Sequence, residues 1–170
     1  MFDSTDDLLN FRIDKAERSL QRTIDWVSRH DMRSNGLFGI SIAMMGMLST
    51  MVPPFPQWNA AIALSIVATV ISFVVTMSSL LLGVLPRTSA PSKSVLFFGS
   101  VARMSTAEVQ AIFDQSDPRS YLEDIVEQYR INATIVALKF RMLKISMIGI
   151  TCMFAPWVMS IYFCKTLIGN

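Results

Sequence analysis

No charged residue lies between Arg33 and Arg87, and this uncharged stretch constrains the fold more than any other feature of the sequence. A cluster of three prolines divides it into two apolar runs, 36–52 and 58–85. Because a helix rises about 1.5 Å per residue, the first run is just long enough to cross a bilayer, and the second can cross with a tilt. The sequence therefore predicts a transmembrane helical hairpin.

Two other interpretations of the hairpin are weaker. A signal peptide would begin nearer the N-terminus, would end in a cleavage-type sequence and would not be followed by a second apolar run. A soluble protein of 170 residues has no core wide enough to bury both runs. A membrane protein remains the best interpretation.

Composition supports this class and excludes others. Hydrophobic residues make up 52% of the chain and charged residues 16%, against about 25% charged in ordinary soluble domains. The net charge of +2 gives no argument for a nucleic-acid partner. Cys152 and Cys164 both lie in a third apolar run, so neither a disulfide framework nor a metal site is indicated.

Two further segments show helical periodicity. The N-terminal segment, 1–35, has a single apolar stripe, and its other face is charged; the stripe contains Leu9, Ile13, Ala16, Leu20, Ile24 and Val27. A second amphipathic helix starts at Asp117 and Pro118 and meets no breaker before Pro156. It leads into the uncharged run 145–164, which we expect to be a third span continuous with that helix.

Basic residues set the expected orientation. Fourteen of the fifteen Lys and Arg residues lie in 1–33 or 87–144, and none lies in the proline-rich turn. The positive-inside rule then places the N-terminus and the 86–144 segment in the cytoplasm and the C-terminus outside. We expect an all-α membrane protein with spans 36–52, 58–85 and 145–164, and a small cytoplasmic bundle formed by the N-terminal helix and the segment 87–144.

Nothing in the sequence indicates catalysis. The single histidine, His30, lies in a charged run with no second histidine or cysteine nearby, so we expect it to be a solvated surface residue. No glycine-rich phosphate loop, HExxH or CxxC motif occurs. We expect no catalytic residue, no metal site and no cofactor, and therefore no enzyme.

Small residues recur along the first predicted span, at Gly39, Ala43 and Gly46 among others, and the second span has a similar stripe. Small residues let helix backbones approach closely in a membrane. They either pack the two hairpin helices on each other or form contacts between copies of the chain. We favour packing within the hairpin, because small residues are common in membrane helices in general.

Polar residues gather next to the predicted spans on the cytoplasmic side. Asp31, Arg33 and Asn35 end the first amphipathic helix, and Asn132 and Lys139 lie on the helix that leads into the last span. In one interpretation the basic side chains reach lipid headgroups and Asp31 pairs with a neighbour. In the other they line a polar pocket for an anionic ligand. Spacing alone favours the first.

Three stretches of the chain carry a resemblance to a known family. The head of the first span reads HDMRSNG, the segment after the second span contains SVLFFGSVARM, and the last helix contains INATIVALKF. Together with the spans, these stretches resemble the transmembrane effectors of Pycsar antiphage systems. The resemblance covers nearly the whole chain from about residue 20.

The family's short motifs map onto individual positions. Asp31 matches an acid that is typically followed by Lys and Ala, whereas here Arg33 and a serine follow. Phe98 lies in an FFG-type loop element, and Asn132 and Lys139 match an Asn and a Lys before the last span. Together with Asn35, these residues are the candidate ligand-binding positions.

The resemblance also implies a function. In such systems a neighbouring cyclase makes a cyclic pyrimidine nucleotide on infection, and the effector senses it and damages the inner membrane, so that the infected cell dies. The expected partners are the bacterial inner membrane, cyclic UMP or cyclic CMP as activating ligand, and further copies of the chain in a homo-oligomer. The alternative function is a structural or scaffolding membrane protein, or a subunit of a larger membrane complex.

Overall fold

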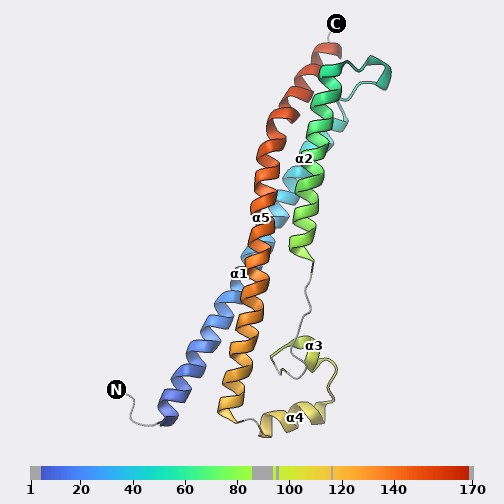
Figure 1. Cartoon of the computed structure of the whole chain (residues 1–170). Coiled ribbons are helices and arrows are strands. Elements are labelled where there is room, and N and C mark those ends of the chain that lie inside the picture. Colours follow the sequence, from blue (N-terminus) through green and yellow to red (C-terminus); the bar gives the residue numbers. More distant parts are fainter. Residues whose placement is uncertain (1–4, 86–93, 95, 116, 169–170) are drawn as a thin grey trace. The chain divides into compact units, whose positions relative to one another are not determined.

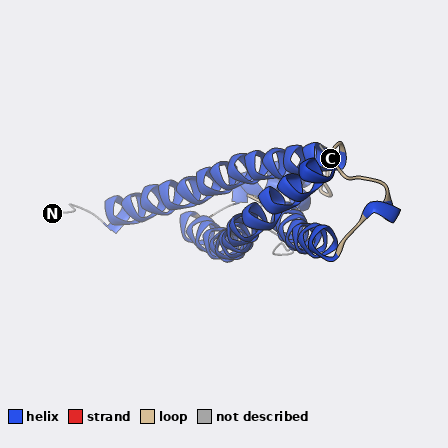
Figure 2. Cartoon of the chain, turned by 90° about the horizontal axis from the view of Figure 1, so that it is seen from above, coloured by secondary structure: helices blue, strands red, loops and turns tan. Residues whose placement is uncertain are grey.

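The computed structural model describes residues 5–85, 94, 96–115 and 117–168 (Figure 1). These residues form helices and connecting loops, with no strand in the described ranges (Figure 2). The prediction of an all-helical chain is therefore confirmed. The elements are α1 (Thr5–Ser49), the 3₁₀ helix η1 (Phe55–Gln57), α2 (Ala60–Val84), α3 (Phe98–Val101), α4 (Thr106–Gln115) and α5 (Pro118–Ile168).

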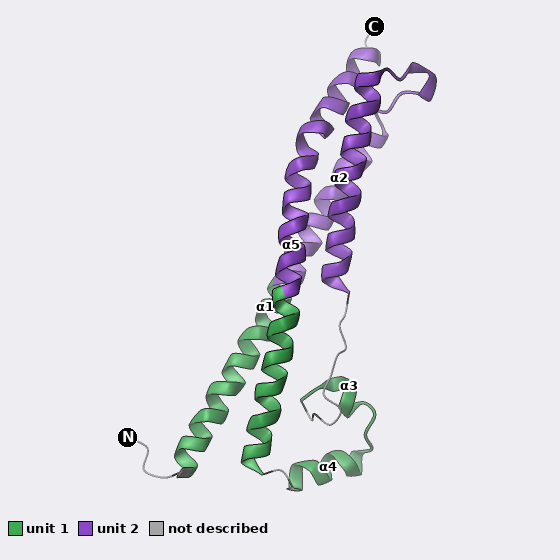
Figure 3. Cartoon of the chain, viewed as in Figure 1, with its two compact units in different colours: residues 1–29, 86–137 green, residues 30–85, 138–170 purple. Residues whose placement is uncertain are grey.

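The chain divides into two compact units (Figure 3). Unit 1 comprises Met1–Arg29 and Pro86–Ala137, and unit 2 comprises His30–Leu85 and Leu138–Asn170. Two helices, α1 and α5, contribute residues to both units. As the absence of internal breakers predicts, α1 continues beyond residue 35, and α5 runs without interruption from Pro118 through Pro156.

Local side-chain caps explain where the helices begin. Asn59 caps α2, because its side-chain oxygen accepts a hydrogen bond of 2.9 Å from the Ile62 amide. Ser105 and Glu108 have the sequence spacing of a capping box, which predicts a helix start here, and they form one at the start of α4. The Glu108 carboxylate accepts from the Ser105 amide at 2.6 Å and from its hydroxyl at 2.8 Å. These two bonds, the backbone one first, lower the pKa of Glu108 below its usual 4.5.

Two helices are long and apolar enough to cross a membrane: α2 over Ala60–Val84, and α5 within Pro118–Leu167. Only 28% and 22% of their most apolar windows are buried inside the protein, whereas the core helix of a soluble protein would be mostly buried. Exposed side chains such as Leu64 (73%) and Ile71 (59%) instead present an apolar surface to the surroundings. The apolar part of α1 ends at Ser49 and is shorter than the about 20 residues of a typical helical span.

Unit 2 is a three-helix arrangement of α2 with the parts of α1 and α5 that belong to this unit. At the end near the C-terminus, Ile62 and Ile66 of α2 pack with Cys164 of α5. Further along, the indole nitrogen of Trp157 donates a hydrogen bond of 2.8 Å to the Met44 carbonyl, which joins α5 to α1. The three helices are thus tied together by both apolar and polar contacts.

Hydroxyl groups within unit 2 bond mainly to their own helices. Each donates to a carbonyl three or four residues earlier, so no hydroxyl among them needs a water partner in an apolar environment. These bonds, of 2.8–3.0 Å, are made by Ser41, Ser65, Thr69, Thr76, Ser146 and Ser160.

Unit 1 contains the N-terminal part of α1, the helices α3 and α4, and the first part of α5. The Tyr121 hydroxyl donates a 2.8 Å hydrogen bond to the Glu17 carboxylate, which connects α5 to α1. Desolvation and the neighbouring Glu17 carboxylate raise the pKa of Tyr121 above 10.0. Ile125 is the buried apolar side chain at the centre of the described part of this unit.

Candidate functional site

A cluster of charged and polar side chains joins α1 to α5 in unit 2. Lys139 of α5 donates a hydrogen bond of 2.6 Å from its ammonium to Asp31 Oδ1 of α1. His30, the residue before Asp31, lies 2.8 Å through Nε2 from the Lys139 carbonyl oxygen and 3.1 Å through Nδ1 from Asp31 Oδ1. We call these three residues the His30–Asp31–Lys139 cluster.

The partners of the histidine ring define which nitrogen donates. A carbonyl oxygen can only accept, so Nε2 must carry a hydrogen and donate to the Lys139 carbonyl. Nδ1 faces the carboxylate of the neighbouring Asp31. Through its two ring nitrogens, His30 thus contacts both α5 and its neighbour on α1.

The cluster is largely removed from solvent. His30 is 1% exposed and Lys139 is 8% exposed, and the ring of Phe140 contacts the imidazole edge-on at 5.7 Å between centroids. Gly83 of α2 covers another side, because a Cβ there would lie 3.6 Å from His30 Cε1 and 3.2 Å from Met142 Cβ. The expectation that His30 is a solvated surface residue is wrong, because the ring fills this space between helices.

The environment of Asp31 sets how the cluster responds to pH. Desolvation alone would raise the pKa of Asp31, but hydrogen bonds and charge from Lys139 and His30 outweigh it and hold the pKa below 3.8. The stability that this carboxylate contributes is therefore fully present above about pH 4, and it is lost only as the pH falls through the lowered pKa. Ionisation of Asp31 does not change between pH 5 and pH 8.

The other predicted ligand-binding residues are not part of the cluster. Arg33 and Asn35 follow Asp31 on α1 and are exposed. Phe98 of α3 is 74% exposed in unit 1. Asn132, also in unit 1, is partly buried, and its amide donates within α5 to the Gln128 carbonyl at 3.0 Å. Of the six positions, the structure brings Asp31 and Lys139 into contact.

Sequence reasoning missed two residues that shape this cluster, His30 and Gly83. Both carry signals that are visible only in retrospect. His30 is adjacent to Asp31, the acid that the family resemblance singles out, and Gly83 ends the stripe of small residues in the second apolar run. Neither signal identifies the partner on another helix.

The two stripes of small residues have different surroundings. Along α2, the side chains of Ser65, Thr76 and Ser79 are buried within unit 2, and Thr76 lies against Gly149 of α5. Along α1, Gly39, Ala43 and Gly46 are exposed, and a Cβ at either glycine would meet nothing within 4 Å. The interpretation that the α1 stripe packs against the second helix of its own hairpin is therefore wrong.

The arrangement forms a bridge between two helices. The Lys139 ammonium of α5 and the Asp31 carboxylate of α1 lie 2.6 Å apart, and the lysine side chain is 10% exposed. This pair fixes the distance and the register of α1 relative to α5 within unit 2.

Comparison with known proteins identifies the family. The family profile described as Pycsar effector protein domain matches residues 15–164, which is nearly the whole chain. The match includes the His30–Asp31–Lys139 cluster, the whole of α2, and α5 as far as Cys164. Searches among curated proteins and among solved structures give no significant match. The extent of the profile match shows that the chain belongs to the Pycsar effector family, the antiphage membrane effectors of Pycsar systems.

Proposed function

We propose that this chain is activated by a cyclic pyrimidine nucleotide and then damages the bacterial inner membrane, which ends the infection by killing the host cell. The observation that carries the proposal is the match of the Pycsar effector domain over residues 15–164. It spans both compact units, so the sensing and the membrane-acting parts of such an effector can both lie within this chain.

The continuity of α1 and α5 supports a mechanism for such activation. Each helix supplies residues to unit 1 and to unit 2 without a break. A ligand that binds one arrangement of these helices better than another shifts the population towards that arrangement. In unit 2 the shift would act on helices that are long and apolar enough to lie in the bilayer.

The ligand's single negative charge needs donors in a partly dry site. Arg33 and Asn35 are exposed, whereas Lys139 already pairs with Asp31 at 2.6 Å. A phosphate that bound Lys139 would compete with Asp31 for the ammonium. Ligand binding at Lys139 would therefore weaken the bridge between α1 and α5, which couples recognition to helix packing.

The proposed activity can be tested with purified protein in dye-loaded liposomes. We expect cyclic UMP or cyclic CMP to release the dye at concentrations at which cyclic AMP does not. Because the proposal includes no catalytic role, the nucleotide should be recovered unchanged afterwards. Absence of release by either pyrimidine nucleotide, with the protein inserted and folded, would contradict direct activation.

We also propose three spans, with the apolar part of α1 joining α2 and α5 in the bilayer, and a cytoplasmic N-terminus. The uneven distribution of basic residues supports this orientation. Reporter fusions at Phe55, at Ser105 and at the C-terminus should read outside, inside and outside. A cytoplasmic reading at Phe55 would mean that α1 and α2 do not form a hairpin that crosses the membrane, and it would contradict the proposed three spans.

Self-association completes the proposal. The exposed face of Gly39, Ala43 and Gly46 offers close helix packing to another copy in the bilayer, where small residues drive association. In a homo-oligomer, the helix packing of several copies can also change together on activation.

A further inference from the structure

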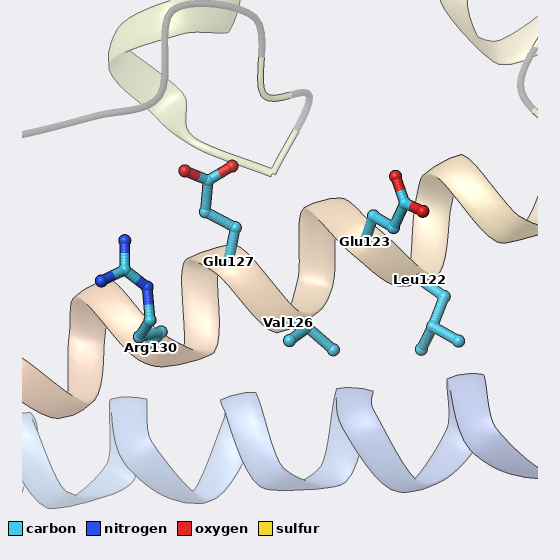
Figure 4. Close-up of a pocket in the computed structure, with 5 residues that line it drawn as sticks. All are labelled: Leu122, Glu123, Val126, Glu127 and Arg130. Atoms are coloured by element: carbon cyan, nitrogen blue, oxygen red, sulfur yellow. The ribbon is translucent and has the colours of Figure 1, made fainter.

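Two adjacent hollows lie on one side of α1 and α5 in unit 1, and they share Leu122 and Val126. The first, of about 400 Å³, is also lined by Arg12 and Lys15 of α1. The second, of about 500 Å³, is completed by Glu123, Glu127 and Arg130 of α5 (Figure 4). In Figure 4 the side chains of Leu122 and Val126 point towards α1, whereas those of Glu123 and Glu127 point away from it.

This surface has an apolar centre that the described residues of unit 1 leave uncovered. Val126 is 51% exposed and Tyr129, which also lines the first hollow, is 41% exposed. In the described part of unit 1, Ile125 is the one apolar side chain that is fully buried. The amphipathic stripes of α1 and α5 thus meet along one line only and leave an apolar strip open.

The edges of the strip carry opposite charges. On the α1 edge lie Arg12 and Lys15, and on the far edge lie Glu123 and Glu127. None of these four side chains takes part in a salt bridge within the described ranges. Arg130 stands one turn beyond Glu127 and reduces, but does not cancel, the acidic character of that edge.

A surface with this order is complementary to itself. A two-fold rotation about an axis parallel to α5 places the apolar strip of one copy on that of the other, and it brings the basic edge of each against the acidic edge of its mate. Copies in one bilayer share their orientation. A two-fold axis that relates two of them therefore runs along the membrane normal and keeps their spanning helices parallel.

We propose that two copies of this chain pair through the strip formed by Leu122 and Val126, with Arg12 and Lys15 of each copy against Glu123 and Glu127 of the other. The inference rests on the self-association proposed above and gives it an interface in unit 1. A small anion is a poorer occupant, because the acidic edge adjoins the basic one and would repel it.

Charge exchange provides a specific test. Arg12→Glu with Lys15→Glu makes both edges acidic, and Glu123→Lys with Glu127→Lys makes both basic. Each double variant should weaken self-association in detergent at least about tenfold, as measured by sedimentation. The two double variants mixed together, or all four changes in one chain, should restore association, because opposite edges then meet again.

Matched controls separate the interface from general charge effects. Arg18→Glu with Arg22→Glu alters charge equally on α1 but outside the two hollows, and it should leave association unchanged. A thiol introduced by Val126→Cys should form a disulfide cross-link with the same thiol of the second copy in membranes. The background carries Cys152→Ser, because Cys152 is exposed, and it keeps Cys164, because that thiol is buried.

The outcomes distinguish this interface from the broader proposal. If the charge variants associate like the parent while Gly46→Leu dissociates, the copies meet through the α1 face in the membrane, and the inference is overturned. If the parent is monomeric, both proposals of self-association fail. If the charge variants lose affinity for cyclic nucleotides in a monomeric parent, the strip is a ligand site and the pairing is again refuted.

Discussion

Replacing Gly149 of α5 by alanine should lower the free energy of unfolding of the chain by about 1–3 kcal/mol, the usual cost of overpacking a close contact. A Cβ at Gly149 would overlap the Thr76 hydroxyl oxygen and would lie 3.4 Å from Thr76 Cβ and 3.5 Å from its Cα. Thr76 is fully buried, and its hydroxyl donates to the Ser72 carbonyl at 2.8 Å, so it has little freedom to move aside.

Two further variants make this prediction specific. Gly39→Ala is the matched control, since nothing lies within 4 Å of its added Cβ, and alanine favours the helix over glycine. Thr76→Ala should rescue Gly149→Ala by removing the atoms that it meets. The midpoints of thermal unfolding in detergent would show the order of stability of these variants. Equal midpoints for Gly149→Ala and Gly39→Ala would mean that α2 and α5 do not approach closely at this point.

Patterns that act within a few residues predicted most of the fold. The capping box of Ser105 and Glu108 and the helix start at Asp117 and Pro118 depend on groups three or four positions apart, and the structure confirms both. The continuity of α5 follows from the absence of breakers over many turns. Such features are local, so the sequence alone contains the physical information needed to predict them.

Features that depend on another helix were not predictable in the same way. Gly39 and Gly83 belong to similar stripes of small residues, yet Gly39 faces open space and Gly83 approaches His30 and Met142. Likewise, His30 looks like a surface residue within its charged segment, but it contacts Lys139, 109 positions away. Periodicity gives the face of a helix and does not identify what that face meets.

The ligand-binding residues illustrate the same limit. The family resemblance placed Asp31 and Lys139 among the functional positions, and their sequence neighbourhoods placed both near one membrane surface. That they pair directly is a property of how α1 and α5 pack in unit 2. Arg33, only two residues from Asp31, lies on an exposed face, because two residues turn a helix by about 200°.

Breaking the bridge from one side should have the largest effect within unit 2. Lys139 is 8% exposed, and Asp31→Ala leaves its ammonium without the partner carboxylate. We expect a loss of about 2–3 kcal/mol in the free energy of unfolding, somewhat below the cost for a fully buried pair, because the Asp31 side chain is 39% exposed. Arg141→Ala, on the exposed side of α5, is the matched control and should change little.

Removing both charges distinguishes the effect of the unpaired ammonium from the other effects of replacing Asp31. Asp31→Ala combined with Lys139→Met eliminates the unpaired ammonium and keeps an apolar side chain of similar length, so stability should return to within about 1 kcal/mol of the parent. Equal destabilisation in the single and the double variant would show that the loss does not come from the unpaired ammonium. If the bridge also holds the effector inactive, Asp31→Ala should release dye from liposomes without nucleotide, because its loss frees α1 from α5 in the way that a ligand phosphate on Lys139 would.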